Sequence, residues 1–535
     1  MSAAAVIAAD SKGAAPVTTY PWLGILAVLL GAIASTLTAR LTTNGLADIR
    51  GAIGAGFDEG AWIPTAYTVA QMLVGPISVW VGRIAGVRTV LLWGAVTFAI
   101  SELLIPLVPS LGWVLALQAL AGLGSGTFIP LTIGFILQSL PARLWSFGIA
   151  AYAMNLELSL NIGATIEGWY SEHASWHWIF WQNAVLALPL IACIWLGIPR
   201  SKYDRETARH GDYWGMAFAA TGLSLLYAAL DQGDRLDWGG SDLIVGLGAA
   251  GLILVAAFLI HEADAEKPGV DLSILLRTNM LLLLMLVALI RSLVIASNYL
   301  VPQFLILVRG LRPLQVGDAL LWVALPQFLL APAVAWLLNH VDGRRVKIVG
   351  MIFLIAANLE ASCLTSAWAE GDFIVPQLLQ AVGQSLALTS IIFVVVKHLT
   401  PAEAIPFGAL LQTARLLGGE IGSAGLQAYS RKTEQFNSNL IGVHVGSYDQ
   451  TTLDRLQEYS GQLLAVSQGA GAANARALGL LDGAIRMQSY TLAFADAFLC
   501  TAGVAAFGIV LVLLLRSAPS TPPTPKTGCG AGSLE

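Results

Sequence analysis

The amino-acid sequence predicts an all-α membrane protein with fourteen transmembrane helices. Of its 535 residues, 56% are hydrophobic and only 11% are charged, whereas soluble proteins carry about 25% charged residues. The hydrophobic residues gather into runs of about 20, the length that crosses a bilayer as a helix. Arginine and lysine concentrate in alternate loops, as they do in multi-pass membrane proteins.

The apolar runs divide the chain into helices joined by mostly short connections. We expect spans near residues 22–47, 62–81, 89–108, 113–138, 145–168, 176–198, 213–231, 242–261, 279–301, 316–338, 346–366, 373–396, 405–428 and 489–515. Because this number of spans is even, both termini lie on the same side of the membrane.

The basic residues of the loops decide which side that is. The loops assigned to the side of the termini carry Arg83, Arg88, Arg143, Arg200, Lys202, Arg205, Arg209, Lys267, Arg277, Arg344, Arg345, Lys347 and Lys397. The short loops of the other side carry only Arg50, Arg235, Arg309 and Arg312. Since positively charged loops stay inside the cell, we expect both termini to be cytoplasmic.

One connection, residues 429–488, is long and polar and lies on the outer side. Its segment DQTTLDRLQEYSGQLL predicts an amphipathic helix that begins at a capping threonine, Thr451 or Thr452. Two interpretations stay open: a surface elaboration without a partner, or a docking surface for a periplasmic protein.

The stretch 146–183 predicts a spanning helix, a short polar loop at 171–175 and a second helix that starts with interfacial tryptophans. Small residues between Gly163 and Gly168 allow a neighbouring helix to approach closely. Glu157 lies about 14 residues, or ~21 Å of helix, beyond Arg143, which is mid-membrane depth. A carboxylate there costs at least ~2.5 kcal/mol to insert, so we expect it to have a function or a partner.

Other charges lie within the spans as well. Arg40, Arg291 and Arg415 fall at depths broadly comparable to that of Glu157, and Glu420 is a second carboxylate in span 13. Proton-driven transport needs a buried group whose protonation competes with substrate, and a carboxylate suits that role. The alternative is a static ion pair or hydrogen-bond network. Glu102 and Glu360 are expected near the outer surface instead.

Several stretches, spread over nearly the whole chain, follow a pattern found in one transporter family. They are AWIPTAYTVAQMLVGPISVWVGRIAGVRTVLL, GLGSGTFIPLT, residues 146–183, LLYAALDQGDRLDWGGSDLI, KPGVDLSILLRTNM, NYLVPQFL and LLQTARLLGGEIGSAGL. Together they resemble the fourteen-helix drug:proton antiporter branch of the major facilitator superfamily, the EmrB/QacA-like multidrug exporters.

The resemblance implies a major facilitator fold, with two six-helix bundles around a substrate cavity that opens alternately to each side. It divides the chain into a cytoplasmic tail at 1–20, an N-terminal bundle at 21–200, inserted helices 7 and 8 with linkers at 201–277, a C-terminal bundle at 278–515 and a cytoplasmic tail at 516–535. The charges support this repeat, because Arg40 and Arg291 lie in the first helix of each bundle, and Glu157 and Glu420 in the fifth.

The sequence departs from the family pattern at several positions. Thr38 stands where the family has an acidic residue, and Gln118 stands where it has an arginine linked to proton coupling. The signature at 163–168 lacks its proline and has gained Glu167. The gating motif is degraded at Arg83 and better preserved in its second copy, at Asp342, Arg344 and Arg345.

From these residues we predict the site of an inner-membrane, proton-driven exporter of amphipathic drugs or toxic organic compounds. Proton coupling is assigned to Glu157 and Glu420, with Arg40, Arg291 and Arg415 as charge partners. The cavity candidates are Gln118, Phe128, Tyr152, Asn155, Asn161 and Tyr299.

The expected partners are the lipid bilayer, the substrate, the proton, and a periplasmic membrane-fusion adaptor with an outer-membrane channel. Two alternatives remain, namely an uncoupled or uptake facilitator for a small metabolite and a membrane scaffold or sensor. The sequence has no nucleophile–base pair, metal-ligand cluster or phosphate loop at usable spacing, which argues against an enzyme, a metal or another cofactor. Its small net charge of −5 gives no support for nucleic-acid binding.

Overall fold

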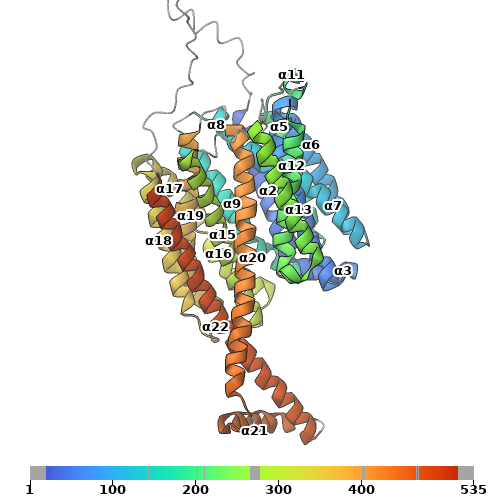
Figure 1. Cartoon of the computed structure of the whole chain (residues 1–535), viewed down its shortest axis with the longest axis vertical. Coiled ribbons are helices and arrows are strands. Elements are labelled where there is room, and N and C mark those ends of the chain that lie inside the picture. Colours follow the sequence, from blue (N-terminus) through green and yellow to red (C-terminus); the bar gives the residue numbers. More distant parts are fainter. Residues whose placement is uncertain are drawn as a thin grey trace, which may run out of the picture.

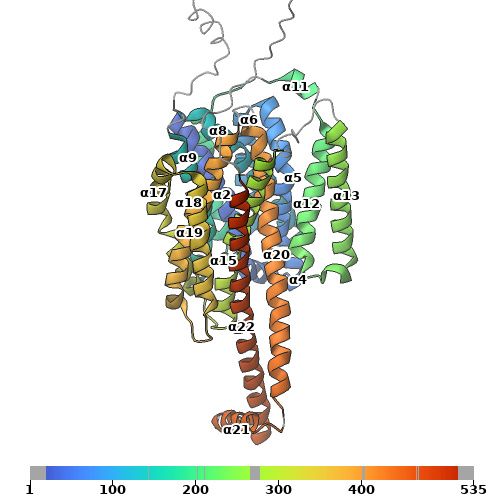
Figure 2. The same cartoon turned by 60° about the vertical axis from the view of Figure 1, so that its left-hand side comes forward.

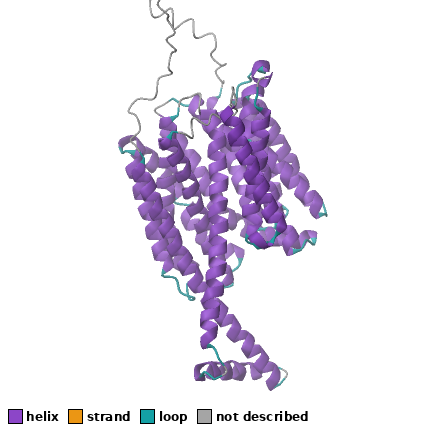
Figure 3. Ribbon diagram, in the orientation of Figure 1, coloured by secondary structure: helices purple, strands orange, loops and turns teal. Residues whose placement is uncertain are grey.

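The computed structural model describes residues 20–141, 144–201, 203–209, 211–264, 277–399, 404–446, 448–465, 467 and 469–515. Within these residues the chain forms helices and turns and no strand (Figure 3). The predicted tails, apart from Tyr20, and the loop residues Arg143, Lys202 and Lys267 lie outside the described residues.

The helices of residues 20–200, here called the first half, pack on one another as a bundle (Figure 1). They are α2 (Pro21–Asn44), α5 (Trp62–Ala85), α6 (Val87–Leu104), α7 (Leu111–Ser125), α8 (Phe128–Ser139), α9 (Trp145–His173) and α10 (Trp178–Gly197). The short helices α3 (Leu46–Ile53), α4 (Phe57–Gly60) and η2 (Ile105–Leu107) lie in connections. Helix α9 continues to His173, into the polar loop predicted at 171–175, and α10 begins at Trp178 after a turn that contains Trp176.

The helices of residues 277–515, here called the second half, form a matching bundle (Figures 1 and 2). They are α15 (Thr278–Leu307), α16 (Pro313–Ala324), α17 (Gln327–His340), α18 (Gly343–Ser362), η5 (Glu370–Phe373), α19 (Ile374–His398), α20 (Ala404–His444), α21 (Gln450–Leu464) and α22 (Ala470–Leu514). The halves meet where α9 packs against α16, α17 and α19, and where α20 packs against α5 and α8.

Between the halves the chain inserts a helix pair, α12 (Tyr213–Gly233) and α13 (Asp242–Asp264), flanked by α11 (Arg205–Arg209) and η4 (Trp238–Gly240). The two helices lie side by side at the edge of the bundle (Figure 2). Whereas α13 packs on α12, α12 also contacts α5 of the first half and α20 of the second. Asp212 caps α12 by accepting a hydrogen bond from the backbone N–H of Gly215 at 2.9 Å.

The perimeter of the molecule is suited to a bilayer. Large apolar side chains such as Trp93, Leu188, Ile253 and Leu329 are exposed on it, where a membrane would cover them. Within the described residues, eleven helical segments are long and apolar enough to span a membrane. Helices α9, α18 and α20 are not among them, so the fourteen predicted spans stay a prediction.

The long connection at 429–488 is largely a continuation of membrane helices. Helix α20 runs on to His444 and α22 starts at Ala470, so the two project together from the bundle and carry α21 at their tip (Figures 1 and 2). The predicted amphipathic helix is present, but Asp449, rather than a threonine, caps it by accepting from the N–H of Thr452 at 2.8 Å. The end of the molecule with α21 is called the α21 end below.

The small residues of α9 bring other helices close, as predicted. A Cβ added at Gly163 would lie 2.9 Å from the Cβ of Arg40 on α2. A Cβ added at Gly168 would lie 2.5 Å from the backbone N of Leu314 at the start of α16. Helix α9 therefore packs tightly on both halves, and at Gly168 its contact with α16 is backbone to backbone.

Candidate functional site

A cavity of about 170 Å³ lies among α2, α5, α9, α12, α15 and α20, so helices of both halves and of the inserted pair enclose it. Its lining residues are Ser35, Thr36, Ala39, Arg40, Thr43, Pro64, Thr68, Gln71, Leu160, Tyr227, Asp231, Arg291, Ile295, Arg415, Leu416, Glu420, Ser423 and Gln427. Arg40 lies in the last turns of α2 and Pro64 in the first turn of α5, which places the cavity toward the α21 end.

Three arginines from three helices meet at this cavity, namely Arg40 of α2, Arg291 of α15 and Arg415 of α20. The side chains of Arg291 and Arg415 are only 9% and 5% exposed. Arg415 donates to Gln412 Oε1 at 2.9 Å and to Thr36 Oγ1 at 3.5 Å, while the Nε atoms of Arg291 and Arg415 have no partner among the described residues. No carboxylate of the described chain forms an ion pair with any of the three.

Two carboxyl groups share the cavity with the arginines. Glu420, 8% exposed, accepts a hydrogen bond from the Tyr227 hydroxyl at 2.9 Å on its Oε2. Asp231 accepts from the Thr65 hydroxyl and from Gln232 Nε2, the latter at 2.8 Å. With both carboxyls ionised the lining carries one net positive charge, and each protonation adds another. An anion entering the cavity therefore meets a field whose strength depends on proton occupancy.

Glu157 occupies a separate place. Its side chain is 0% exposed, it does not line the cavity, and neither carboxylate oxygen has a hydrogen-bond partner in the described chain. One turn along α9, Asn161 donates to the backbone oxygen of Glu157 at 2.7 Å and to Gln384 Oε1 of α19 at 3.3 Å. Asn298 of α15 donates to Asn161 Oδ1 at 3.0 Å. Glu157 is thus buried beside a polar contact between the halves.

The structure brings together only part of the predicted set. Arg40, Arg291, Arg415 and Glu420 line one cavity, whereas Glu157, the expected counterpart of Glu420, lies elsewhere. The predicted pairing of arginines with these glutamates is not formed among the described residues.

The predicted cavity candidates outside this set are buried in helix contacts. Phe128 packs edge-on against Phe98, with ring centroids 5.9 Å apart, and Asn155 donates to the backbone oxygen of Leu29 at 2.7 Å. The polar side-chain atoms of Gln118 and the hydroxyl of Tyr152 are buried without a described partner, and Tyr299 packs beside the second apolar core. None of these residues lines the cavity.

Two titratable residues of the cavity, Tyr227 and Asp231, were not predicted. They lie four residues apart on α12, within the apolar run LLYAALDQ, so they share one face of that helix. This spacing was the only available signal, and it does not tell which neighbour the face meets. Glu102, expected near the outer surface, lies in the last turn of α6, where it is completely buried among helices and accepts from Asn183 Nδ2 at 3.2 Å.

The two copies of the predicted gating motif lie at the end opposite α21. Asp342 caps α18 through the N–H of Arg344 at 3.0 Å, and the Arg344 guanidinium lies 3.6 Å from the same carboxylate. Arg344 also donates to the backbone oxygen of Leu515 at the end of α22. Arg83 and Arg345 are exposed. The second copy therefore ties α18 to α22 within one half.

Comparisons with known proteins agree with this geometry. The family model described as Major Facilitator Superfamily matches residues 28–423. The chain is 25% identical to the colistin resistance protein EmrB of Acinetobacter baumannii, covering 89% of this chain and 92% of that protein. It is 24% identical to the fatty acid resistance protein FarB of Neisseria gonorrhoeae and 23% identical to the multidrug export protein EmrB of Escherichia coli, in each case covering 95% of this chain and 97% of the relative.

Solved structures with the same fold have lower sequence identity. The human organic anion transporter MFSD10 matches with a TM-score of 0.56 at 15% identity, covering 92% of this chain and 99% of that chain. The proton:xylose symporter XylE matches with a TM-score of 0.57 at 11% identity, covering 93% of this chain and 96% of that chain.

Proposed function

We propose that this chain is a proton-driven exporter, on the premise that it belongs to the major facilitator superfamily. Within that family it is an EmrB-like drug efflux transporter of the membrane and not an enzyme. It extrudes amphipathic drugs or toxic organic compounds across the inner membrane by alternating access. Two six-helix bundles, 21–200 and 278–515, enclose the substrate, and both termini are cytoplasmic. The arginine- and carboxyl-lined cavity between the halves is the observation that carries this proposal.

Proton coupling is assigned to the carboxyls that lie between the halves. Glu420 shares its cavity with Arg40, Arg291 and Arg415, so a proton on Glu420 changes the net charge that a substrate meets. Glu157 is a second candidate, because a completely buried carboxyl without a described partner is costly in its ionised form.

Alternating access requires contacts between the halves that separate in turn. At the α21 end, α9 meets α16, where the Thr165 hydroxyl donates to the Gly317 backbone oxygen at 2.9 Å. At the opposite end, α20 meets α8, where a Cβ at Gly408 would lie 2.0 Å from the backbone oxygen of Pro130. We assign these two contacts to the outer and inner closures of the transport cycle.

The cavity favours substrates that combine an acidic group with an apolar body. Guanidinium groups bind carboxylates and related anions with directed hydrogen bonds, and three of them converge here without an ion pair to a described carboxylate. Leu160, Ile295 and Leu416 supply apolar lining. The names of two similar proteins, a fatty acid resistance protein and an organic anion transporter, fit this class.

The projecting helices are proposed to hand substrate to a periplasmic adaptor and an outer-membrane channel. A cavity of about 420 Å³ between α21 and α22 is lined largely by apolar side chains, including Leu453, Leu456, Leu464 and Leu478. Because α20 packs against α22, deletion of residues 440–485 leaves two neighbouring helix ends to be rejoined. The deletion is expected to abolish co-purification of the adaptor, and unchanged complex formation would remove this part of the proposal.

The test of proton-driven export is transport by the purified protein in liposomes. A proton gradient should drive accumulation of an acidic amphipathic dye, and dissipation of the gradient should stop it. Glu420→Gln and Glu157→Gln separate the two carriers, because the variant of the true carrier still exchanges dye without responding to the gradient. Transport by the wild type that only equilibrates the dye would favour the facilitator alternative.

A further inference from the structure

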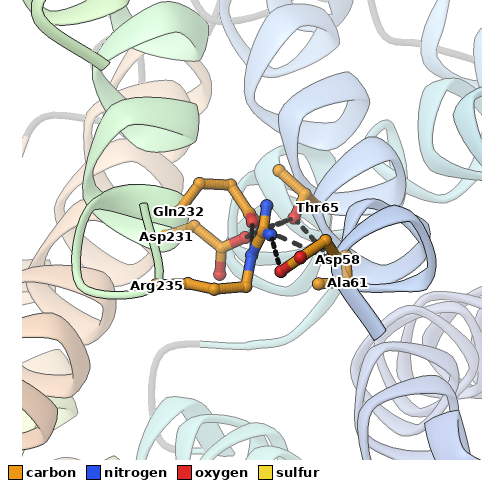
Figure 4. A network of polar contacts seen from close by, with 6 residues as sticks. All are labelled: Asp58, Ala61, Thr65, Asp231, Gln232 and Arg235. Carbon is orange, nitrogen blue, oxygen red and sulfur yellow. Dashed lines mark hydrogen bonds and ion pairs between the residues drawn. The ribbon is translucent and has the colours of Figure 1, made fainter. Parts of the chain in front are cut away.

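The inserted helix α12 contacts both halves of the transporter, and its contacts with them are unequal. Toward the first half it is anchored by a polar network at its last turn (Figure 4). Asp231 accepts from the Thr65 hydroxyl, Gln232 donates to the backbone oxygen of Ala61 at 3.3 Å, and Arg235 forms an ion pair with Asp58 at 2.6 Å.

Further hydrogen bonds extend this anchor. Arg235 Nε donates to Gln232 Oε1 at 2.8 Å, so the ion pair and the amide network are joined. Two turns earlier, the Ser224 hydroxyl donates to the backbone oxygen of Val69 on α5 at 3.2 Å. Helix α12 is therefore fixed to α4 and α5 by side chains along its whole α21-end half.

Toward the second half, the described residues show two polar contacts from α12 and its C-terminal cap. The Tyr227 hydroxyl donates to Glu420 Oε2 at 2.9 Å, and Asp234 lies 3.1 Å from the guanidinium of Arg431 on α20. Tyr227 is only 7% exposed, so its hydroxyl is directed into the cavity wall beside the carboxyl. A bond from a hydroxyl to an ionised carboxylate is stronger than one between neutral groups.

We infer that α12 is a working part of the transport site, in which Tyr227 is a positioning residue for the Glu420 carboxyl. The hydroxyl holds Oε2 and leaves Oε1 for a proton or for the cavity. Because α12 is anchored to the first half and Glu420 belongs to the second, the hydrogen bond from Tyr227 to Glu420 breaks when the halves move apart at the cavity. Glu420 thus loses a donor in one conformation, which links its protonation to the movement of the halves.

This inference rests on the proposed function for its meaning in transport, but the bond itself is testable without transport. The charged and titratable groups that line the cavity with Glu420 are Tyr227 and Asp231 of α12, Arg40 of α2, Arg291 of α15 and Arg415 of α20. Tyr227→Phe removes one oxygen atom and keeps the ring, so these charges stay in place. Ser224→Ala is the matched control, because it removes a bond from the same helix to α5 outside the cavity.

The experiment is pH-difference infrared spectroscopy of the full-length protein in liposomes. The carboxyl band of Glu420 is assigned by its loss in Glu420→Gln. In Tyr227→Phe that band should move in frequency and its titration midpoint should change, whereas Ser224→Ala should leave both values as in the wild type. Proton-driven export of the dye should fall about tenfold in Tyr227→Phe, whereas adding Tyr227→Phe to Glu420→Gln should change the remaining gradient-independent dye exchange by much less than twofold.

Each result decides between the alternatives. The inference is overturned if Tyr227→Phe leaves the Glu420 band unchanged. It is also overturned if Glu420→Gln removes no band from the wild-type spectrum. A further loss of gradient-independent exchange when Tyr227→Phe is added to Glu420→Gln overturns it as well, since that loss indicates a general structural role for the hydroxyl. If the band shifts as expected while wild-type export ignores the proton gradient, the positioning role stands and the proposed proton-driven function fails.

Discussion

The tight backbone contacts at the two ends of the molecule predict opposite effects of two glycine substitutions. In Gly168→Ala the new methyl group would lie 2.5 Å from the backbone N of Leu314, and in Gly408→Ala it would lie 2.0 Å from the backbone oxygen of Pro130. Backbone atoms cannot rotate away as a side chain can, so the helices must separate. Overpacking of this kind costs about 1–3 kcal/mol.

That cost is present only while the contact is closed, so it shifts the conformational equilibrium. A penalty of about 1–3 kcal/mol changes the ratio of closed to open states by roughly 5-fold to 150-fold. Gly168→Ala is expected to favour molecules that are open at the α21 end, and Gly408→Ala to favour molecules that are open at the other end.

The assay is electron spin resonance distance measurement in a cysteine-free background. Labels at Glu172 and Arg309 report on the α21 end, and labels at Phe147 and Asn339 report on the opposite end. Gly112→Ala is a control, because nothing lies within 4 Å of a Cβ added there. Distance distributions that stay unchanged in both variants, or that widen at the same end in both, would refute the assignment of these contacts to two alternating closures.

Two further predictions concern helix caps outside the spans. Burial raises the pKa of Asp212, but the Gly215 N–H and the His261 ring 2.8 Å away lower it further, so the net pKa lies below its usual range. Asp212→Ala should lower the free energy of unfolding by about 1–2 kcal/mol at pH 7, as measured by thermal unfolding in detergent. Because these hydrogen bonds stabilise only the ionised form of Asp212, the loss of stability in Asp212→Ala should shrink as the pH falls below about 4. A loss that stays constant with pH would contradict this prediction. The hydroxyl and N–H of Thr452 lower the pKa of Asp449, so Asp449→Ala should fray the first turn of α21 and speed limited proteolysis there, with wild-type cleavage rates as the contrary result.

The architecture could be predicted from the sequence because hydropathy reports directly on the bilayer. A helix of about 20 apolar residues matches the thickness of the hydrocarbon core, so apolar runs of that length predict spans. The described helices lie at the predicted runs. The exceptions are informative. Helix α20 was predicted to end near 428 but continues to His444. Outside the bilayer, a polar sequence does not by itself distinguish a helix from a loop, and here packing against α22 holds the segment as a helix.

The site was predicted less completely, because sequence gives the depth of a residue in a membrane but not the direction in which it points. Arg40, Arg291 and Glu420 were predicted at broadly comparable depth, and all three line the cavity. Glu157 was predicted by the same depth argument, yet its buried side chain lies outside the cavity and has no hydrogen-bond partner among the described residues. Helix α9 is buried on several sides, so its polar pattern does not single out one face.

The inserted helix shows why the number of helices says little about their roles. Helices α12 and α13 have similar lengths and both look like additions to a complete transporter. In α13 most side chains face outward, and its packing partner is α12, whereas α12 brings Tyr227 and Asp231 into a cavity that already holds three arginines. Without Asp231 the lining would carry two net positive charges with Glu420 ionised, and Glu420 would lose its hydroxyl donor if Tyr227 were absent too. The insertion therefore alters both the charge of the cavity and the setting of the Glu420 carboxyl, so the proposed transport site cannot be derived from the two six-helix bundles alone.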